Sequence, residues 1–345
     1  MPNDILTRAI DAVCDGTHLT ADHASAVLDE IMEGRADSVQ TGAFLVALRA
    51  KGETVAELVG LARTMRRLAA HVESDRGDLV DTAGTGGGPS TFNISTAAAL
   101  VAAASGCAVA KHGNRSSTSR SGSADVLEAL GVNIELGPDD IASCIEEVGF
   151  GFMFAPRHHA AMKHVVPVRQ ELAVRTIFNF LGPLTNPAGA SRQLLGVSDR
   201  GYQETIAEAL VGLGCERALV VTGADGVDEL TLADETRVIE VADGGTEEWF
   251  VRPEEHGFER RPLDAIAGGS PEENAHAVRE ALTEGHGPAH DVIVLNAGAA
   301  ILVGGGAQVL GAGIEKARDA IRSGAATRVL DSLIETTGRL AGTAA

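Results

Sequence analysis

Residues 81–96 read DTAGTGGGPSTFNIST, from Asp81 to Thr96, and this stretch decides the fold. Its start belongs to a predicted strand, Leu79–Thr82, and its end opens a predicted helix of small residues, Ile94–Ser105. Glycines between them let backbone N–H groups approach a ligand, and a helix N-terminus adds unpaired donors and a positive dipole end. The stretch therefore predicts a phosphate-binding loop. A tight strand-to-helix turn without a ligand explains the glycines alone equally well.

The pattern of short apolar strands and helices continues on both sides of this loop. It predicts a helix over Ala124–Leu130 and further strands over Cys107–Ala110, Gly151–Phe154, Ala218–Thr222 and Val292–Asn296. Strands that alternate with helices are typical of an α/β domain with a mostly parallel central sheet.

The first 70 residues predict helices only. Thr20 is a good N-cap before a helix that Gly34 ends, a second helix starts near Ser38, and a third carries Val55 on its apolar face. We expect a small helical domain over residues 1–70, hinged to an α/β catalytic domain over 71–345. Residues 162–181 have a helical pattern that a Gly-Pro break ends, so part of 162–190 is expected to join the helical domain.

Two further segments carry groups suited to an anionic ligand. Lys111 to Asp125, just after a predicted strand, is rich in cations, hydroxyls and amide groups that can bind an oxygen-covered anion. Asp228 and Glu229 follow the predicted strand Ala218–Thr222, where adjacent carboxylates can hold a hard cation such as Mg²⁺. A solvated acidic turn explains the second segment equally well in so acidic a chain.

The composition limits the partners. The chain has 345 residues, of which 44% are hydrophobic, and a formal net charge of -20. Such a charge repels polyanions at long range, so we expect no binding to nucleic acid or to an acidic membrane surface. No apolar run is long enough to predict a membrane span, no leader is expected, and four dispersed cysteines predict neither a disulfide framework nor a zinc site. A cytoplasmic location is the expectation.

Five sequence blocks occur in a fixed order along the chain. They are the Gly84 loop with Asn93 to Thr96, Lys111-His-Gly-Asn-Arg with Gly122-Ser-Ala-Asp, residues 168–179 (VRQELAVRTIFN), residues 181–187 (LGPLTNP), and Asp228-Glu229. Together they resemble the anthranilate phosphoribosyltransferases over nearly the whole chain. The resemblance implies a helical domain hinged to a larger α/β domain, a homodimer formed through the helices, and Mg²⁺ as cofactor. The implied reaction joins the ribose C1 of phosphoribosyl pyrophosphate (PRPP) to the amino group of anthranilate, in tryptophan biosynthesis.

The resemblance also implies roles for individual residues. Ser95, Asp228 and Glu229 match the Mg²⁺ positions, and Gly84, Asn114 and Arg169 match positions that contact anthranilate. Lys111, Asn114 and Arg169 are expected to be the catalytic residues. Besides Arg169, the substrate positions implied by the resemblance are matched mainly to PRPP and include some of the residues just named. They are Gly84, Gly87, Gly88, Thr91, Asn93, Ile94, Ser95, Thr96, Lys111, His112, Gly113, Asn114, Arg115, Ser116, Ser117, Thr118, Ser119 and Ser123.

One departure from the family pattern concerns the glycine loop. The family loop usually reads Gly-Thr-Gly-Gly-Asp-Gly, whereas here Gly87 is followed by Gly88 and Pro89, and the spacing to Asn93 is one residue shorter. The loop has lost a carboxylate, and with it that group's part in positioning a metal or a ribose hydroxyl.

Other assignments were weighed against this one. His158, His159 and His164 lack metal-ligand spacing, so surface or hinge roles are expected. Arg175 is expected to be structural, one helical turn after Glu171. A pyrimidine nucleoside phosphorylase shares the predicted layout but uses phosphate and a nucleoside without PRPP. A noncatalytic nucleotide-binding relative would bind single-stranded DNA rather than anthranilate, and the presence of both Asn114 and Arg169 argues against it.

Overall fold

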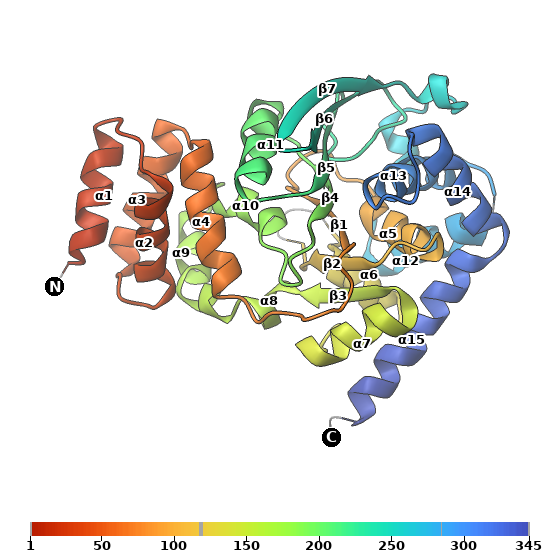
Figure 1. The fold of residues 1–345 in the computed structure, drawn as a ribbon, viewed down its shortest axis with the longest axis horizontal. Coiled ribbons are helices and arrows are strands. Elements are labelled where there is room, and N and C mark those ends of the chain that lie inside the picture. Colours follow the sequence, from red (N-terminus) through yellow and green to blue (C-terminus); the bar gives the residue numbers. More distant parts are fainter. Residues whose placement is uncertain (1, 117–119, 284, 344–345) are drawn as a thin grey trace.

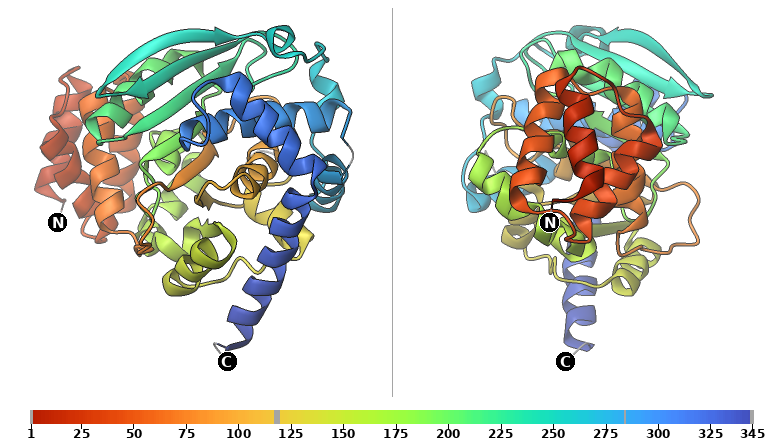
Figure 2. Two further views of the ribbon diagram at one scale, coloured as in Figure 1. Left: turned by 45° about the vertical axis from the view of Figure 1, so that its right-hand side comes forward. Right: turned by 90° about the vertical axis from the view of Figure 1, so that its left-hand side faces the viewer.

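The computed structural model describes residues 2–116, 120–283 and 285–343. N-terminal helices form a bundle beside a larger unit built on one sheet, and the C-terminal helix projects from the opposite side of that unit (Figure 1). In the right-hand view of Figure 2 the bundle lies in front of the sheet. None of the helices within the described residues is long and apolar enough to span a membrane.

The bundle follows the helix signals of the sequence. The side chain of Thr20 accepts a hydrogen bond from the His23 N–H, as expected of an N-cap. Thr54 and Glu57 form a capping box at the start of the fourth helix, and Gly52, at φ 89°, ends the third. The bundle helices are α1 (Asp4–Cys14), α2 (Ala21–Met32), α3 (Ser38–Lys51) and α4 (Val55–Arg67).

The sheet has seven strands in the order β3-β2-β1-β4-β5-β6-β7. The first five in this order are parallel, and β6 and β7 are antiparallel, which confirms the mostly parallel α/β class. Chain order runs outward from β1 through β2 and from β4 through β5, so the direction changes between β1 and β4. Ligands of open α/β sheets bind at the carboxyl ends of strands at such a switch point. The strands are β1 (Val80–Gly84), β2 (Val109–Gly113), β3 (Phe150–Phe154), β4 (Arg192–Gly196), β5 (Arg217–Gly223), β6 (Thr236–Ala242) and β7 (Gly245–Val251).

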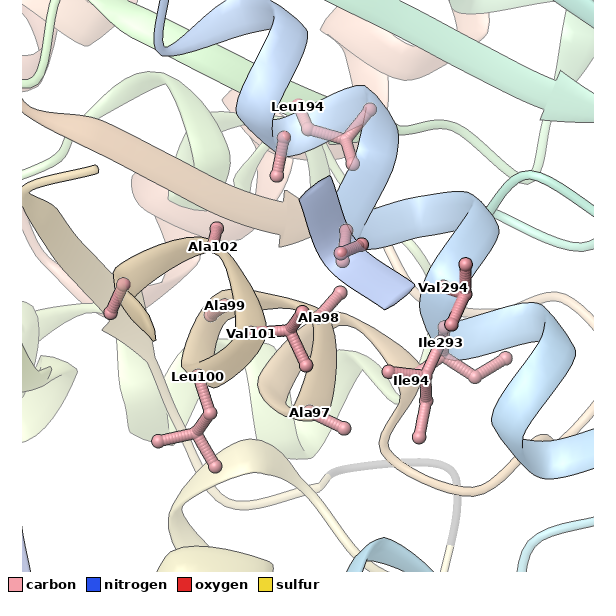
Figure 3. Close-up of a cluster of buried hydrophobic side chains, with 14 of the residues drawn as sticks. Ile94, Ala97, Ala98, Ala99, Leu100, Val101, Ala102, Leu194, Ile293 and Val294 are labelled. Carbon is pink, nitrogen blue, oxygen red and sulfur yellow. The ribbon is translucent and has the colours of Figure 1, made fainter. Parts of the chain in front are cut away.

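Alternate strand residues enter two different cores. Leu194 and Leu219 pack with α5 (Ile94–Ala104) and α13 (Pro288–Val303), whereas Leu195 and Val220 pack with α11 (Gln203–Gly212) and the bundle. The small side chains of α5 allow the close approach of α13 seen in Figure 3. Four more helices cover the sheet: α6 (Ser123–Leu130), α7 (Pro138–Val148), α12 (Pro271–Thr283) and α14 (Leu310–Arg322), with α15 (Ala325–Thr343) crossing outside them.

Short helices link the two units. They are α8 (Ala155–His158), η1 (Ala160–His164), α9 (Val166–Leu172), α10 (Phe178–Leu181) and η2 (Gly182–Leu184), and three more short turns follow at η3 (Arg200–Tyr202), η4 (Pro253–His256) and η5 (Leu263–Ile266). A Cβ placed on Gly42 of α3 would lie in ordinary contact with Val168 and Leu172, so α9 packs on the bundle. The assignment of part of 162–190 to the helical domain stays a prediction.

Two expected elements are wrong. The helix over 162–181 is interrupted after Leu172, because Ala173 adopts a left-handed conformation with φ 51°. The strand over Val292–Asn296 is instead part of α13, a helix that is buried along most of its length. A short β-branched apolar run fits a buried strand and a buried helix equally well, so periodicity could not separate them.

Candidate active site

The glycine loop and the acidic turn touch each other. The N–H of Gly86 donates to Asp228 Oδ2 at 2.8 Å, and the Gly86 carbonyl accepts from Ser198 Oγ at 2.7 Å. A Cβ on Gly84 would lie less than 3.0 Å from Asp228 Oδ2, so a glycine is needed at this strand end. The N–H groups of Gly87 and Gly88 have no partner within the described part of the chain. They are therefore open to a ligand.

Internal bonds hold the acidic turn in one conformation. Asp225 accepts from the Val227 N–H at 3.2 Å and from Thr231 Oγ1 at 2.7 Å. Asn296, on α13, accepts from the Leu230 N–H at 3.0 Å and donates to the Leu230 carbonyl at 2.9 Å. The predicted carboxylates of Asp228 and Glu229 thus belong to a turn that Asn296 of α13 holds in place.

The two carboxylates lie where negative charge is costly. Both are partly exposed, yet enough protein surrounds them that burial raises the pKa of Asp228 and, together with the Asp228 charge, that of Glu229. Glu229 Oε1 accepts from the Ser95 N–H at 3.2 Å, at the start of α5. Carboxylate and hydroxyl oxygens of Asp228, Glu229 and Ser95 are hard ligands of the type that Mg²⁺ prefers.

Lys111 lies beneath this group and is buried. Its Nζ donates to the Thr82 carbonyl, to Thr82 Oγ1 at 3.1 Å and to Ser95 Oγ at 3.3 Å. Burial lowers its pKa, while the charges of Asp81 and Glu229 act in the opposite direction. All three ammonium donors are thus engaged, and Lys111 faces Ser95 from inside the protein.

A buried carboxyl group fixes the backbone beside Lys111. Asp81 Oδ1 accepts from the His112 N–H at 3.1 Å, and Asp81 Oδ2 accepts from Asn186 Nδ2 at 2.7 Å. Asn186 also donates to the Ala110 carbonyl at 2.8 Å. Burial raises the pKa of Asp81 to about 6, although Lys111 and these donors favour the charged form. The sequence motifs did not indicate that Asp81 and Asn186 would support the site.

His112 is neutral and has one free nitrogen. Its Nδ1 donates to the Gly182 carbonyl at 3.2 Å, which leaves Nε2 as a buried acceptor without a partner among the described residues. Burial, followed by the nearby His159, lowers the pKa of His112 to about 3. The ring of His159 lies 5.1 Å from that of His112, centroid to centroid.

The segment after β2 presents fewer free groups than expected. Arg115 pairs with Asp125 at 2.9 Å and with Glu128, and these two hydrogen bonds raise its pKa. Asn114 is exposed, its side chain accepts from the Arg115 N–H at 2.7 Å, and Ser123 Oγ donates to its carbonyl at 3.3 Å. Gly113 ends β2 next to Ser123, and Ser116 donates its N–H to Asp125 at 3.2 Å. The predicted positions Ser117, Thr118 and Ser119 lie outside the described residues.

The start of α5 combines exposed and buried positions. Asn93 accepts from Ser121 Oγ at 3.1 Å and from Asn274 Nδ2 at 2.9 Å, and Thr91 forms an isolated bridge with Ala267. The side chains of Ile94 and Thr96 are buried in the core. Their side chains therefore do not face a ligand.

Two arginines stand on the segment that links the two units, and the structure brings only Arg175 into contact with the glycine loop. Arg169 on α9 lies 5.6 Å from the centre of the Phe178 ring, has no ion pair within the described chain, and has a pKa lowered by burial. Arg175 lies beyond the end of α9, so it is not one helical turn from Glu171. Its Nη2 instead donates to the Gly86 carbonyl at 3.2 Å. The structural pairing expected for Arg175 is therefore wrong.

Of the three histidines near the site, two are buried and one is exposed. His158 and His159 are buried, and His158 Nδ1 donates to the Ala70 carbonyl at 2.8 Å, in the chain between α4 and β1. Among His, Cys, Asp and Glu side chains in the described ranges, no group of three or more is arranged to hold a metal ion. The expected hinge position fits His158, and the expected surface position fits only the exposed His164.

The chain is similar to known proteins over nearly its whole length. Residues 7–69 match the family model "Glycosyl transferase family, helical bundle domain", and residues 76–327 match "Glycosyl transferase family, a/b domain". It is 53% identical over 340 residues to the anthranilate phosphoribosyltransferase of Rubrobacter xylanophilus, covering 98% of this chain and 99% of the relative. It is 52% identical to that of Haloferax volcanii, covering 94% and 98%.

Solved structures give the same similarity. The anthranilate phosphoribosyltransferase of Thermus thermophilus matches with a TM-score of 0.90 and 46% identity, covering 95% of this chain and 99% of that one. The enzyme of Saccharomyces cerevisiae, solved in complex with PRPP and Mg, matches with a TM-score of 0.89 and 28% identity, covering 97% and 98%. The yeast enzyme was also solved with 4-fluoroanthranilate.

Proposed function

Because this chain belongs to the anthranilate phosphoribosyltransferase family, we propose how its own residues bind the two substrates and catalyse the transfer. The reaction moves the phosphoribosyl group of PRPP to the amino group of anthranilate, giving N-(5-phosphoribosyl)anthranilate and pyrophosphate in tryptophan biosynthesis. The observation that carries the residue assignments is the meeting of three segments at the carboxyl ends of β1, β2 and β5. They are the glycine loop, Lys111 with its neighbours, and Asp228-Glu229.

PRPP binds at the glycine loop and the start of α5 in this proposal. The unpartnered N–H groups of Gly87 and Gly88 and the positive end of α5 suit a phosphate group. Thr91, Asn93 to Thr96 and residues 111–119 with Ser123 complete the binding surface, Ile94 and Thr96 through their backbone. The yeast relative solved in complex with PRPP and Mg supports PRPP as the ligand of this class of enzyme.

Mg²⁺ fits the residues that the family pattern assigns to it. Asp228, Glu229 and Ser95 supply hard oxygen atoms, and a dication would favour the charged form of each carboxyl group, whose pKa burial raises. When bound, Mg²⁺ would neutralise charge on the pyrophosphate and favour its departure. Asp228 and Glu229 would hold it through their carboxylates, whose orientation is fixed by hydrogen bonds from the Gly86 and Ser95 N–H groups.

Anthranilate binds between the linking segment and β2 in the same proposal. Arg169, which lacks an ion pair in the described chain, binds the anthranilate carboxylate through charge-assisted hydrogen bonds. Asn114 orients the ring and the amine, and Gly84 allows close approach at the strand end. The anthranilate analogue bound by the yeast relative supports this class of acceptor.

The transfer is a displacement at C1. The bond from C1 to the pyrophosphate oxygen breaks with its electron pair on pyrophosphate, and the nitrogen lone pair of anthranilate forms the new bond from the opposite face. The nitrogen then loses a proton to solvent or to pyrophosphate. His112, with a pKa of about 3, is too weak a base to accept this proton. Its uncharged ring instead lines the proposed substrate site.

We also propose the domain bounds, the oligomeric state and the cellular location. Residues 1–70, with part of 162–190, form the helical domain, and 71–345 form the catalytic domain. The exposed Val39 and Val46 on α3 support dimerisation through the helices, which light scattering of the purified protein tests. A cytoplasmic location belongs to the same proposal.

One assay tests the activity. Anthranilate fluorescence should fall when PRPP and Mg²⁺ are both present and should stay constant when EDTA removes the metal. A nucleoside phosphorylase would instead cleave a nucleoside with inorganic phosphate and ignore PRPP. Isothermal titration with anthranilate and with single-stranded DNA separates the enzyme from a noncatalytic nucleic-acid-binding relative.

A further inference from the structure

Two cations proposed to bind PRPP, Lys111 and Arg115, are already engaged in this structure. Lys111 is buried and gives its donors to Thr82 and Ser95, and Arg115 pairs with Asp125 and Glu128. PRPP carries a pyrophosphate and a 5-phosphate, and the chain around it is acidic. A cation that is not already paired is therefore of particular interest at the glycine loop.

Arg175 is such a cation. Its Nη2 donates to the Gly86 carbonyl at 3.2 Å, and a Cβ on Gly87 would lie 2.7 Å from its Nη1. The guanidinium thus covers Gly86 and Gly87 directly, and both adopt positive φ angles, 64° and 84°. Within the described residues it forms no ion pair, and residues 84–93 contain no Asp or Glu that could neutralise it.

The position of Arg175 is fixed from the helical bundle. Its carbonyl accepts from Arg49 Nη1 of α3 at 2.9 Å, and its guanidinium lies 5.6 Å from the centre of the Phe180 ring. The left-handed Ala173 turns the chain out of α9 just before it. These contacts place a cation from the linking segment over a loop of the other unit.

Arg175 also lies close to the acidic turn. The residue whose carbonyl accepts from Arg175 Nη2 at 3.2 Å, Gly86, donates its N–H to Asp228 Oδ2 at 2.8 Å. A single residue of the glycine loop thus separates the guanidinium from the carboxylate that is proposed to hold the metal. An arginine fork with free N–H groups matches the geometry of phosphate oxygens.

We propose that Arg175 is a further substrate-binding residue, which donates hydrogen bonds to the pyrophosphate group at the glycine loop. This inference rests on the proposed function and adds a residue that the motif comparison does not assign. Arg175 would thus place a positive charge on pyrophosphate beside a loop that lacks the usual family carboxylate. One Nη group can keep its bond to Gly86 while the other nitrogens face the ligand.

Titration with inorganic pyrophosphate, at fixed Mg²⁺, tests the contact without requiring turnover. Arg175→Gln should weaken pyrophosphate binding about tenfold or more, and Arg175→Lys should lose less because it keeps the charge. In the coupled assay the KM for PRPP should rise with Arg175→Gln while the KM for anthranilate stays unchanged. Circular dichroism checks that each variant is folded.

Two matched variants separate a direct contact from other effects. Ser198→Ala removes the other side-chain bond to the Gly86 carbonyl, so it tests loop tethering alone. Arg322→Gln removes one exposed positive charge on α14. Both should change pyrophosphate affinity much less than Arg175→Gln. Equal losses in Ser198→Ala and Arg175→Gln, or no loss in Arg175→Gln, would overturn the proposal.

The two proposals fail in different ways. If the wild-type protein consumes no anthranilate with PRPP and Mg²⁺, the proposed function fails. If it turns over normally but Arg175→Gln binds pyrophosphate as tightly as the wild type, only the role of Arg175 fails. A wild-type protein that binds no pyrophosphate overturns the role of Arg175 whatever its activity.

Discussion

Removal of the Asn186 amide should destabilise the protein in a way that depends on pH. Asn186 is buried and donates at 2.7 Å to Asp81 Oδ2, which has no other described side-chain donor. A hydrogen bond to a charged group contributes roughly 1.5–3 kcal/mol, and a buried carboxylate left without its donor costs a similar amount. Asn186→Ala should therefore cost about 2–4 kcal/mol near pH 8, which for a chain of 345 residues lowers the Tm by about 3–6 °C.

The sign of the pH effect follows from the pKa of Asp81. Burial raises that pKa from 3.8 to about 6, so the folded state binds a proton more readily than the unfolded state. This group's contribution to stability is present at low pH and is lost as pH rises through the window from about 4 to 6. The Asn186 bond favours the carboxylate, so its loss should raise the pKa further. The Tm difference between Asn186→Ala and wild type should then grow from pH 5 to pH 8.

Differential scanning fluorimetry at several pH values measures this difference. Asn133→Ala is the matched control, because its side chain only accepts from the Glu135 N–H at 2.9 Å near the surface. Its Tm difference should be small and constant with pH. In an Asp81→Asn background, the pH dependence caused by Asn186→Ala should disappear. A Tm difference that is the same at pH 5 and pH 8 would refute the assigned pairing of Asn186 with a titrating Asp81.

Three further outcomes follow from the site. Arg169→Ala should raise the KM for anthranilate about tenfold or more, since a charge-assisted hydrogen bond is worth roughly 1.5–3 kcal/mol, and an unchanged KM would remove Arg169 from the acceptor site. The double variant Asp228→Asn, Glu229→Gln should lose most Mg²⁺-dependent turnover while staying folded, and normal dependence would mean that the metal is held elsewhere. Insertion of Asp between Gly87 and Gly88 should increase inhibition by excess Mg²⁺, measured at fixed PRPP, because it adds a metal ligand; superimposed titration curves would contradict this.

Local sequence signals predicted the part of the fold that holds the site. A strand, a glycine loop and a helix start were expected at residues 79–105, and β1 and α5 lie within one or two residues of those bounds. The N-cap at Thr20 and the stop at Gly34, which has φ 71°, were likewise local features. Each of these depends on the conformational preference of a few adjacent residues, which a single sequence carries.

The misassigned elements depended on tertiary contacts. The apolar run at Val292–Asn296 became a helix because α13 is packed among α5, α14 and the sheet. The antiparallel strands β6 and β7 and the strand β4 were not expected at all. Their neighbours in the sheet come from distant segments, so pairing rather than local pattern decides them.

The supports of the site were missed for the same reason. Asn186 meets Asp81 across 105 positions of the chain, Asn296 meets Leu230 across 66, and Arg175 meets Gly86 across 89. Asn186 and Arg175 did stand inside the quoted motifs, which was the available signal. A motif gives the residue type and its neighbours, but it does not give the partner that a side chain contacts.

A chain with a net charge of -20 has to attract a polyanion over short distances, because salt screens exposed charges beyond roughly 8 Å. Lys111 and Arg115, two cations proposed to bind PRPP, are already bonded within the protein. In the proposed site the remaining attraction would come from the N–H groups of the glycine loop, from the start of α5, from Arg175, and from Mg²⁺ held by the two acidic residues. Pyrophosphate neutralised by Mg²⁺ suits such a surface better than free pyrophosphate does, because each carboxylate that repels the free anion becomes a ligand of the metal.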